Sequence, residues 1–232
     1  DRSTLPGVLE RFGDDQAGGK EGRDLESLAI DPDSGTVWGG YEFRKSIIRF
    51  HADLRVDEEV SPPLMRDWGG NSGAEALVRF ADGRFLVIEE RPLRWRESRH
   101  VALLFATDPI DDAEPESVRV DIPGGYRPVD ATPLEDGRAL ILLRRLALGI
   151  PPGFETAIAV IDIDRRTADG RIPARLLAEF GTAIPQDNYE GMTITDDADG
   201  RHVWLISDDN FMALQRTLLL KLRWNQREKA RE

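Results

Sequence analysis

A strand–turn–strand unit occurs four times in this chain, and the repetition restricts the fold more than any other feature. Each copy has a short apolar run, a turn of aspartate and glycine, and a second apolar run, which is the pattern of a β-hairpin. An acidic residue opens the first run of each copy, and these residues are spaced 49, 55 and 60 positions apart: Glu26, Glu75, Asp130 and Glu190. Strand-rich repeats of about 50 residues are typical of propeller blades.

Further strands are expected after each hairpin. A third apolar run occupies residues 46–50, 101–105, 157–163 and 217–222, and a weaker fourth run lies near 60–65, 118–122 and 176–180. The last copy lacks a fourth run, so we expect residues 8–12 to supply its outer strand and close the ring. The sequence thus predicts an all-β protein, a β-propeller of four-stranded antiparallel blades, with four recognisable repeats and room for more in the full-length protein. Residues 1–20 form an N-terminal segment, 21–223 the propeller and 224–232 a charged tail.

Composition narrows the classes of function. The net charge of −12 disfavours a surface for duplex nucleic acid, which requires a basic face. The chain has no cysteine, which excludes disulfides and thiol catalysis, and it has no apolar run long enough to span a membrane. It contains no Gly-x-Ser-x-Gly motif, and His51, His100 and His202 do not fall at the acidic strand ends, so a Ser-His-Asp triad is not expected.

The acidic residues are predicted to meet at one end of the molecule. In an antiparallel hairpin with a tight turn, the start of the first strand lies beside the end of the second. Glu75 is therefore expected near Glu90, and Glu26 near Glu42. Because the first strand of a blade is the innermost, these carboxylates should ring one mouth of the central channel. Crowded carboxylates favour a hard divalent cation, and Ca²⁺ is the first choice. The predicted metal ligands are Glu26, Glu75, Asp130, Glu190 and Asp208.

The loops after the second strands open at the same mouth and carry arginines. A basic rim above an acidic floor suits a metal-bound anion such as a phosphate ester, whereas ordinary ion pairing between rim and floor is the structural alternative. The predicted catalytic residues are Glu190, Asp208, Arg144 and Arg216. The predicted ligand-binding residues are Asn71, Arg91, Asn188 and Tyr189, of which Tyr189 is also interpretable as a packed aromatic residue.

Four segments carry a resemblance to a known family. They are Asp24-Leu25-Glu26-Ser27-Leu28-Ala29, Asn71-Ser72-Gly73-Ala74-Glu75-Ala76-Leu77, Asn188-Tyr189-Glu190-Gly191-Met192, and Ile206-Ser207-Asp208-Asp209-Asn210-Phe211 followed by Gln215-Arg216-Thr217. Over about residues 20–223 the sequence resembles the phytase-like domain proteins, bacterial and often exported β-propellers described by an esterase-like activity of phytase. The resemblance implies ester or phosphoester hydrolysis, calcium dependence, and a periplasmic or secreted location. Family members have a further N-terminal hairpin, so a ring lacking one blade is expected here.

Three functions are left open by the sequence. The first is a calcium-dependent hydrolase of phosphate or carboxylate esters that acts on a small anionic substrate. The second is a non-catalytic propeller that binds a ligand or a protein at the same mouth. The third is a lactonase similar to the gluconolactonase propellers. The oligomeric state is not indicated by the sequence.

Overall fold

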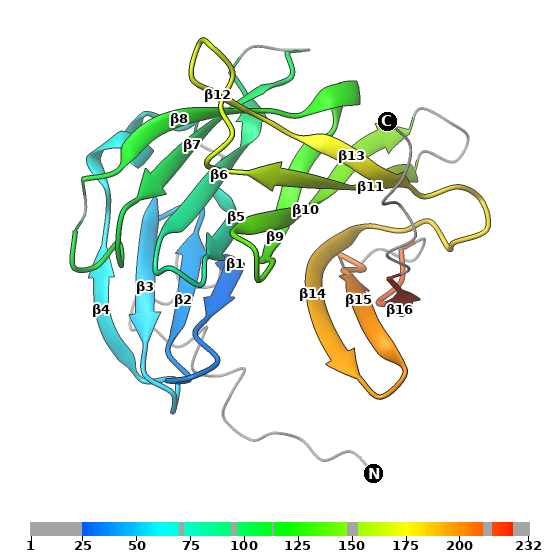
Figure 1. The fold of residues 1–232 in the computed structure, drawn as a ribbon, viewed down its shortest axis with the longest axis horizontal. Helices are drawn as coiled ribbons and strands as arrows, with labels where there is room; N and C mark the ends of the chain where they lie inside the picture. The colour runs from blue at the N-terminus through cyan, green and yellow to red at the C-terminus, as the bar shows by residue number, and fades with distance from the viewer. Residues whose placement is uncertain are drawn as a thin grey trace.

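Four small sheets are arranged as blades around a common centre (Figure 1), as the repeats predict. The structure, a computed structural model, describes residues 25–69, 72–93, 97–112, 114–147, 153–210 and 215–224. The predicted N-terminal segment 1–20, the closing strand 8–12 and nearly all of the tail 224–232 lie outside these residues. No described helix is long and apolar enough to cross a membrane.

The blades follow the order of the chain. Blade 1 contains β1 (Leu25–Ile30), β2 (Val37–Tyr41), β3 (Ser46–Phe50) and β4 (Val56–Val60). Blade 2 contains β5 (Ala74–Arg79), β6 (Phe85–Pro92), β7 (Arg99–Phe105), β8 (Glu116–Asp121) and the short β12 (Arg171–Pro173). Blade 3 contains β9 (Arg127–Pro133), β10 (Arg138–Ala147), β11 (Gly153–Asp162) and β13 (Arg175–Glu179). Blade 4 contains β14 (Tyr189–Asp197), β15 (Gly200–Ser207) and β16 (Leu219–Arg223).

The predicted hairpin turns are present in all four blades. Each turn places its glycine at a positive φ, a conformation that side chains with a Cβ rarely adopt: Gly35 (73°), Gly83 (89°), Gly137 (80°) and Gly200 (118°). The turn aspartates also fix the backbone, since the Asp82 carboxylate accepts the N–H of Arg84 at 3.1 Å. The same local chemistry therefore sets the register of each hairpin.

Two details of the strand prediction are corrected. The fourth strand of blade 1 ends at Val60, whereas we expected it near residues 60–65. Pro62 and Pro63 have no N–H to pair with a neighbouring strand, and Pro63–Asp67 forms a 3₁₀ helix instead. In blade 2, β12 adds a short parallel strand beside β8 that the sequence pattern did not indicate.

The hydrophobic core is divided among the spaces between neighbouring blades. Ala29 and Trp38 of blade 1 pack in one cluster with Phe85 of blade 2. Comparable clusters join blade 2 to blade 3 and blade 3 to blade 4. A blade in the middle of the array is thus covered on both faces, which is why β6 is buried from Phe85 to Glu89 without alternation.

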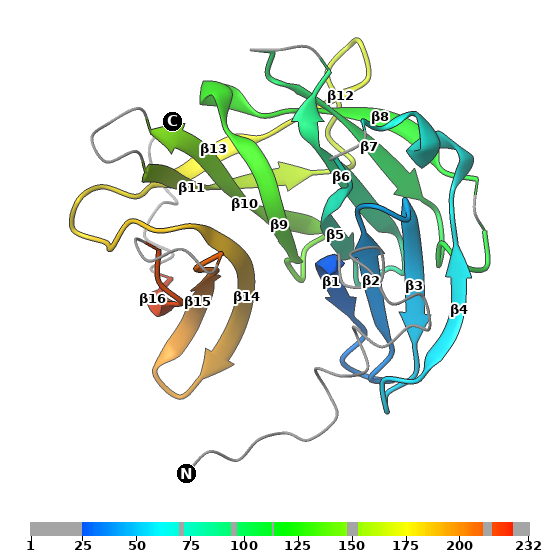
Figure 2. The ribbon, with the colours of Figure 1, turned by 180° about the vertical axis from the view of Figure 1, so that it is seen from behind.

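The first strand of each blade is innermost, as expected. β1 packs beside β5, β5 beside β9, and β9 beside β14. β1 and β14 do not pack against each other in this way, and both views show a wide separation between blades 1 and 4 (Figures 1 and 2). Within the described residues the ring is therefore open on one side.

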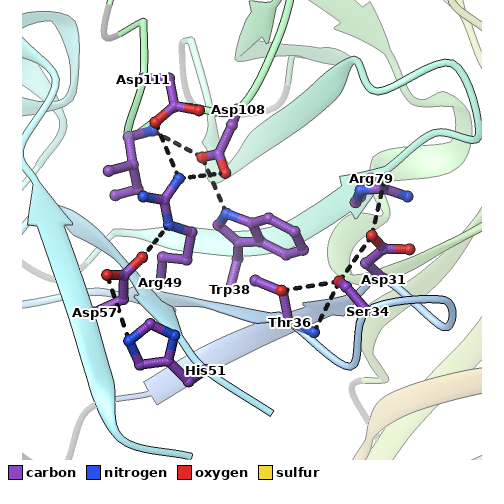
Figure 3. Close-up of polar contacts among 11 residues, drawn as sticks. Asp31, Ser34, Thr36, Trp38, Arg49, His51, Asp57, Arg79, Asp108 and Asp111 are labelled. Atoms are coloured by element: carbon purple, nitrogen blue, oxygen red, sulfur yellow. Dashed lines mark hydrogen bonds and ion pairs between the residues drawn. The ribbon is translucent and has the colours of Figure 1, made fainter.

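Polar contacts tie blade 1 to blade 2 at the end where the hairpins turn (Figure 3). The guanidinium of Arg49 on β3 contacts Asp108 at 2.8 Å and Asp111 at 3.1 Å, both in the loop after β7. The indole of Trp38 donates to the same Asp108 carboxylate at 3.0 Å. Arg79 on β5 reaches Asp31 of blade 1 at 3.3 Å. This network lies at the opposite end from the predicted site and fixes how the two blades pack.

Candidate functional site

A β-bulge interrupts the first strand of every blade near its start. In β1, β5 and β14 the residue left without a direct partner is Glu26, Glu75 and Glu190, respectively. A bulge adds one residue to a strand and changes the direction in which its side chain points. Three of the four predicted leading acids thus occupy the same structural position in three different blades.

Glu75 is at the centre of a group of carboxylates. Its side chain is buried, and burial, followed by the negative charges of Glu26, Glu90 and Glu42, raises the pKa of Glu75 from 4.5 to about 9. Arg144 acts in the opposite direction but does not cancel these effects. Glu75 therefore holds a proton at neutral pH. We refer to Glu26, Glu42, Glu75, Glu90 and Glu190 as the mouth glutamates.

Arg144, near the C-terminal end of β10, connects mouth glutamates of blades 2 and 4. Its guanidinium pairs with Glu190 of blade 4 and lies 3.5 Å from Glu90 of blade 2. It also donates to the side-chain oxygen of Asn188, whose amide nitrogen donates to Glu190 at 2.7 Å. Arg127 lies 3.7 Å from Glu90 and adds a second positive charge. The site thus combines several carboxylates with arginines that are already paired.

Asp130 does not occupy the position of the other leading acids. The bulged residue of β9 is Val129, and Asp130 pairs directly with Leu142 rather than lying beside Arg144. One carboxylate oxygen accepts the N–H of Ala131 at 2.8 Å, and the other accepts the N–H of Met192 at 2.6 Å. Asp130 therefore connects blade 3 to blade 4 through backbone hydrogen bonds. Burial of the carboxyl group disfavours its charged form and raises the pKa of Asp130 to about 7, although the two backbone hydrogen bonds act in the opposite direction.

The remaining predicted catalytic residues lie near blade 4. Asp208 is exposed at the end of β15, and its carboxylate accepts the N–H of Asn210 at 3.1 Å. Arg216 does not line the cavity described below, and its Nε donates to the Asp187 carboxylate at 3.1 Å. The structure thus brings Glu190, Arg144 and Asp208 to one cavity and leaves Arg216 outside it.

The predicted ligand-binding residues are similarly divided. Tyr189 is 1% exposed and its hydroxyl donates to the Pro185 carbonyl at 2.8 Å, so it is placed as a packed aromatic residue. Asn188 is fully buried and positions Arg144 and Glu190. Arg91 is exposed on β6 and does not line the cavity. Asn71 lies outside the described residues.

A cavity of about 1200 Å³ extends from the mouth glutamates into the open side of the ring. It is lined by the first strands of all four blades and by β15 on the exposed face of blade 4. Glu26, Glu75, Glu90 and Glu190 line it together with Arg144, whereas His51, His100 and His202 do not. His100 is buried, with Nδ1 at 3.1 Å from the Glu89 carbonyl. The described part of the site therefore offers carboxylates and arginine rather than a histidine base.

Calcium fits the site in donor chemistry but not in assembled geometry. Carboxylate oxygens are the ligands that a hard cation prefers, and the crowding around Glu75 would be relieved by positive charge. Among the residues that the structure describes, however, no three carboxylate or histidine side chains lie close enough together to hold a metal ion. Calcium binding stays a prediction.

Two features of the site were missed from the sequence. The first is the position of Asp130. The leading acid precedes the turn glycine by nine residues in blade 1, eight in blade 2, seven in blade 3 and ten in blade 4, so this spacing does not by itself show which acid occupies the bulge. The second is Arg127, which precedes the bulge of β9 in blade 3 and reaches Glu90 of blade 2. Contacts between blades leave no periodic signal in the sequence.

Comparisons with solved structures give distant matches. One is hydrazine synthase of Kuenenia stuttgartiensis, at 14% identity and a TM-score of 0.42, covering 83% of this chain and 46% of that chain. Another is a nidogen/laminin complex, at 14% identity and a TM-score of 0.44, covering 79% of this chain and 56% of that chain. A third is a luciferin-regenerating enzyme, at 14% identity and a TM-score of 0.41, covering 86% of this chain and 76% of that chain. The chain spans about half the length of the first two structures.

The sequence itself provides the classification. None of the curated proteins matches it. Residues 8–211, most of the chain, match the family described as phytase-like, "esterase-like activity of phytase". This range contains all four hairpins and every mouth glutamate. The chain therefore belongs to the phytase-like family.

Proposed function

We propose that this chain carries the reaction centre of an ester hydrolase, located at the mouth glutamates. The observation that carries the proposal is the position of Glu26 of blade 1 and Glu90 of blade 2 around the buried, protonated carboxyl group of Glu75. Pairs of carboxyl groups in different protonation states can serve as base and acid in the same reaction. The family description, with its esterase-like activity, supports the same class of chemistry.

The roles follow from the environment of each group. A carboxylate facing the cavity, Glu26 or Glu190, would accept a proton from water as the water attacks the ester carbonyl carbon. The positive charge of Arg144, which stays paired with Glu190, would act at longer range on the negative oxygen that forms. Glu75 in its neutral form would donate its proton to the leaving alcohol as the C–O bond breaks. Glu26, Glu75 and Glu90 carry the oxygen atoms that a calcium ion prefers, but the described carboxylates are not assembled as a metal site, so these roles are assigned to the side chains alone.

Carboxylate esters are favoured over phosphate esters. Recognition of a phosphate group commonly uses an arginine whose N–H groups are available to the anion. Arg144 is already paired with Glu190 and Asn188, and Arg216 is paired with Asp187. The same pairing favours a second candidate, a non-catalytic propeller that binds a ligand at this cavity, because paired arginines and carboxylates can serve structure alone.

Hydrolysis assays separate the two candidates. The substrates are p-nitrophenyl butyrate, p-nitrophenyl phosphate and a γ-lactone, each with Ca²⁺ and with a chelator. Turnover of the butyrate ester is expected, with a loss on the order of 100-fold in Glu26→Gln and in Arg144→Met. Glu58→Gln, on the exposed strand β4 outside the cavity, serves as the control and should retain full activity. Absence of turnover on all three substrates would contradict the hydrolase and favour the binding propeller, whereas turnover of the lactone alone would indicate a lactonase.

A further inference from the structure

The cavity has an aliphatic wall that the proposed chemistry does not use. Four large aliphatic side chains that line it are strongly exposed: Leu28 (47%), Ile30 (59%), Ile206 (48%) and Leu219 (65%). Two come from β1 and two from blade 4, the elements on either side of the opening in the ring. Single exposed aliphatic residues are common on protein surfaces, but a group of them on one concave surface indicates a binding site.

The charged lining of the same cavity is strongly acidic. The described lining residues include eight carboxyl side chains and three arginines: Glu26, Glu75, Glu90, Asp130, Glu135, Glu190, Asp196 and Asp208, with Arg79, Arg144 and Arg201. Each of these arginines is held by a carboxylate. Arg79 lies 3.3 Å from Asp31, Arg144 pairs with Glu190, and Arg201 lies 2.7 Å from Asp196. An anionic ligand would therefore meet excess negative charge, and the arginines of this lining already have partners.

The aliphatic wall begins close to the mouth glutamates. Leu28 and Ile30 follow Glu26 on the same strand by two and four residues, and a strand rises about 3.3 Å per residue. The wall therefore extends to about 13 Å from Glu26 along β1. A ligand whose charged group lies at the mouth can place a chain of this length against the wall.

We propose that this cavity binds an organic cation with an aliphatic body. The positive group lies among Glu26, Glu75 and Glu90, and the aliphatic body lies along β1 against Leu28 and Ile30, with Ile206 and Leu219 on the other side of the cavity. A metal ion would interact with the carboxylates alone and would leave the aliphatic wall exposed, whereas an organic cation can contact both. The proposal predicts that inositol polyphosphates, which carry several negative charges and no aliphatic body, do not bind in the cavity. The inference rests on the proposed function in one respect, since it names the class of ester that the mouth would hydrolyse.

Binding can be measured separately from hydrolysis. Isothermal titration calorimetry, in buffer with a chelator, would compare butyl-, hexyl- and octyltrimethylammonium with octyl sulfate and inositol hexakisphosphate. Affinity should rise with chain length, by up to about fourfold for each methylene group that is covered. Octyl sulfate should bind at least tenfold more weakly than the ammonium compound of equal length, and the hexakisphosphate should not bind. Equal affinity for the sulfate, or no dependence on chain length, would overturn the proposal.

Matched variants locate the binding. Leu28→Ser and Ile30→Ser should weaken the binding of octyltrimethylammonium several-fold, whereas Leu146→Ser should not, because Leu146 is 59% exposed on β10 but outside the cavity. Glu26→Gln should weaken binding, and Glu58→Gln should leave it unchanged. Equal losses in the cavity and control variants would refute the assignment. If the cation binds as expected but no ester is hydrolysed, the hydrolase proposal fails and the binding site stands.

Discussion

Replacing Glu75 with glutamine is expected to stabilise the protein at neutral pH. Burial and the neighbouring Glu26, Glu90 and Glu42 raise the pKa of Glu75 from 4.5 to about 9 in the folded chain. The folded state therefore binds this proton more tightly than the unfolded state. The contribution of this proton to the free energy of unfolding is fully present below pH 4.5 and is lost as the pH rises toward 9. Each pH unit above the unfolded pKa costs about 1.4 kcal/mol, so the loss at pH 7.5 is about 4 kcal/mol. Glutamine resembles the protonated acid and does not suffer this loss.

The assay is urea unfolding across this pH range, followed by circular dichroism. The difference in unfolding free energy between Glu75→Gln and the parent protein should be small near pH 4.5, increase to about 4 kcal/mol near pH 7.5, and become constant above pH 9. Glu58→Gln should show no such dependence, because Glu58 is exposed on β4. A difference that does not change with pH, or a variant less stable than the parent at pH 7.5, would refute the reasoning about the crowded mouth.

Three further predictions concern the connections between blades and the predicted metal. Asp130→Ala removes the acceptor of the Met192 N–H and should lower the unfolding free energy by about 1–3 kcal/mol in urea titrations, and an unchanged value would contradict its role between blades 3 and 4. Arg49→Met leaves the half-buried Asp108 without its ion pair and should cost about 1–3 kcal/mol at low salt, with a smaller loss in high salt; a loss independent of salt would argue for packing instead. Calcium at 100- to 1,000-fold above its Kd should raise the unfolding free energy by about 3–4 kcal/mol relative to chelator, and Glu26→Gln should abolish the effect, so an absent shift in the parent protein counts against the metal.

The sequence predicted the parts of the fold that depend on local chemistry. Aspartate and glycine in each turn determine where a strand reverses, and the apolar alternation around them identifies the strands. The four sheets of the described residues, the hairpin at the start of each and the shared position of Glu26, Glu75 and Glu190 follow from these signals, whereas the total number of blades was left open. The short strand β12 was not predicted because three residues carry too little pattern to separate a strand from a loop.

Features set by contacts between blades were not predictable in the same way. The spacing of Asp130 resembles that of Glu75, but a shift of one residue relative to the turn places it between blades 3 and 4. The arginines predicted to hold an anion are paired with carboxylates that are distant in sequence, as Arg144 is with Glu190. Leu219 and Ile206 are apolar residues that the sequence pattern alone would place in the core, whereas the structure places them on the exposed face of blade 4.

The most direct test of the mouth is the titration of the Glu75 carboxyl group, followed by carbon-13 NMR in the parent protein and in Glu26→Gln. The convergence of carboxylates from blades 1 and 2 predicts a pKa of about 9 in the parent protein and a clearly lower pKa when Glu26 is neutral. An ordinary pKa near 4.5, or a raised value that does not respond to the substitution, would show that these glutamates do not meet at one site.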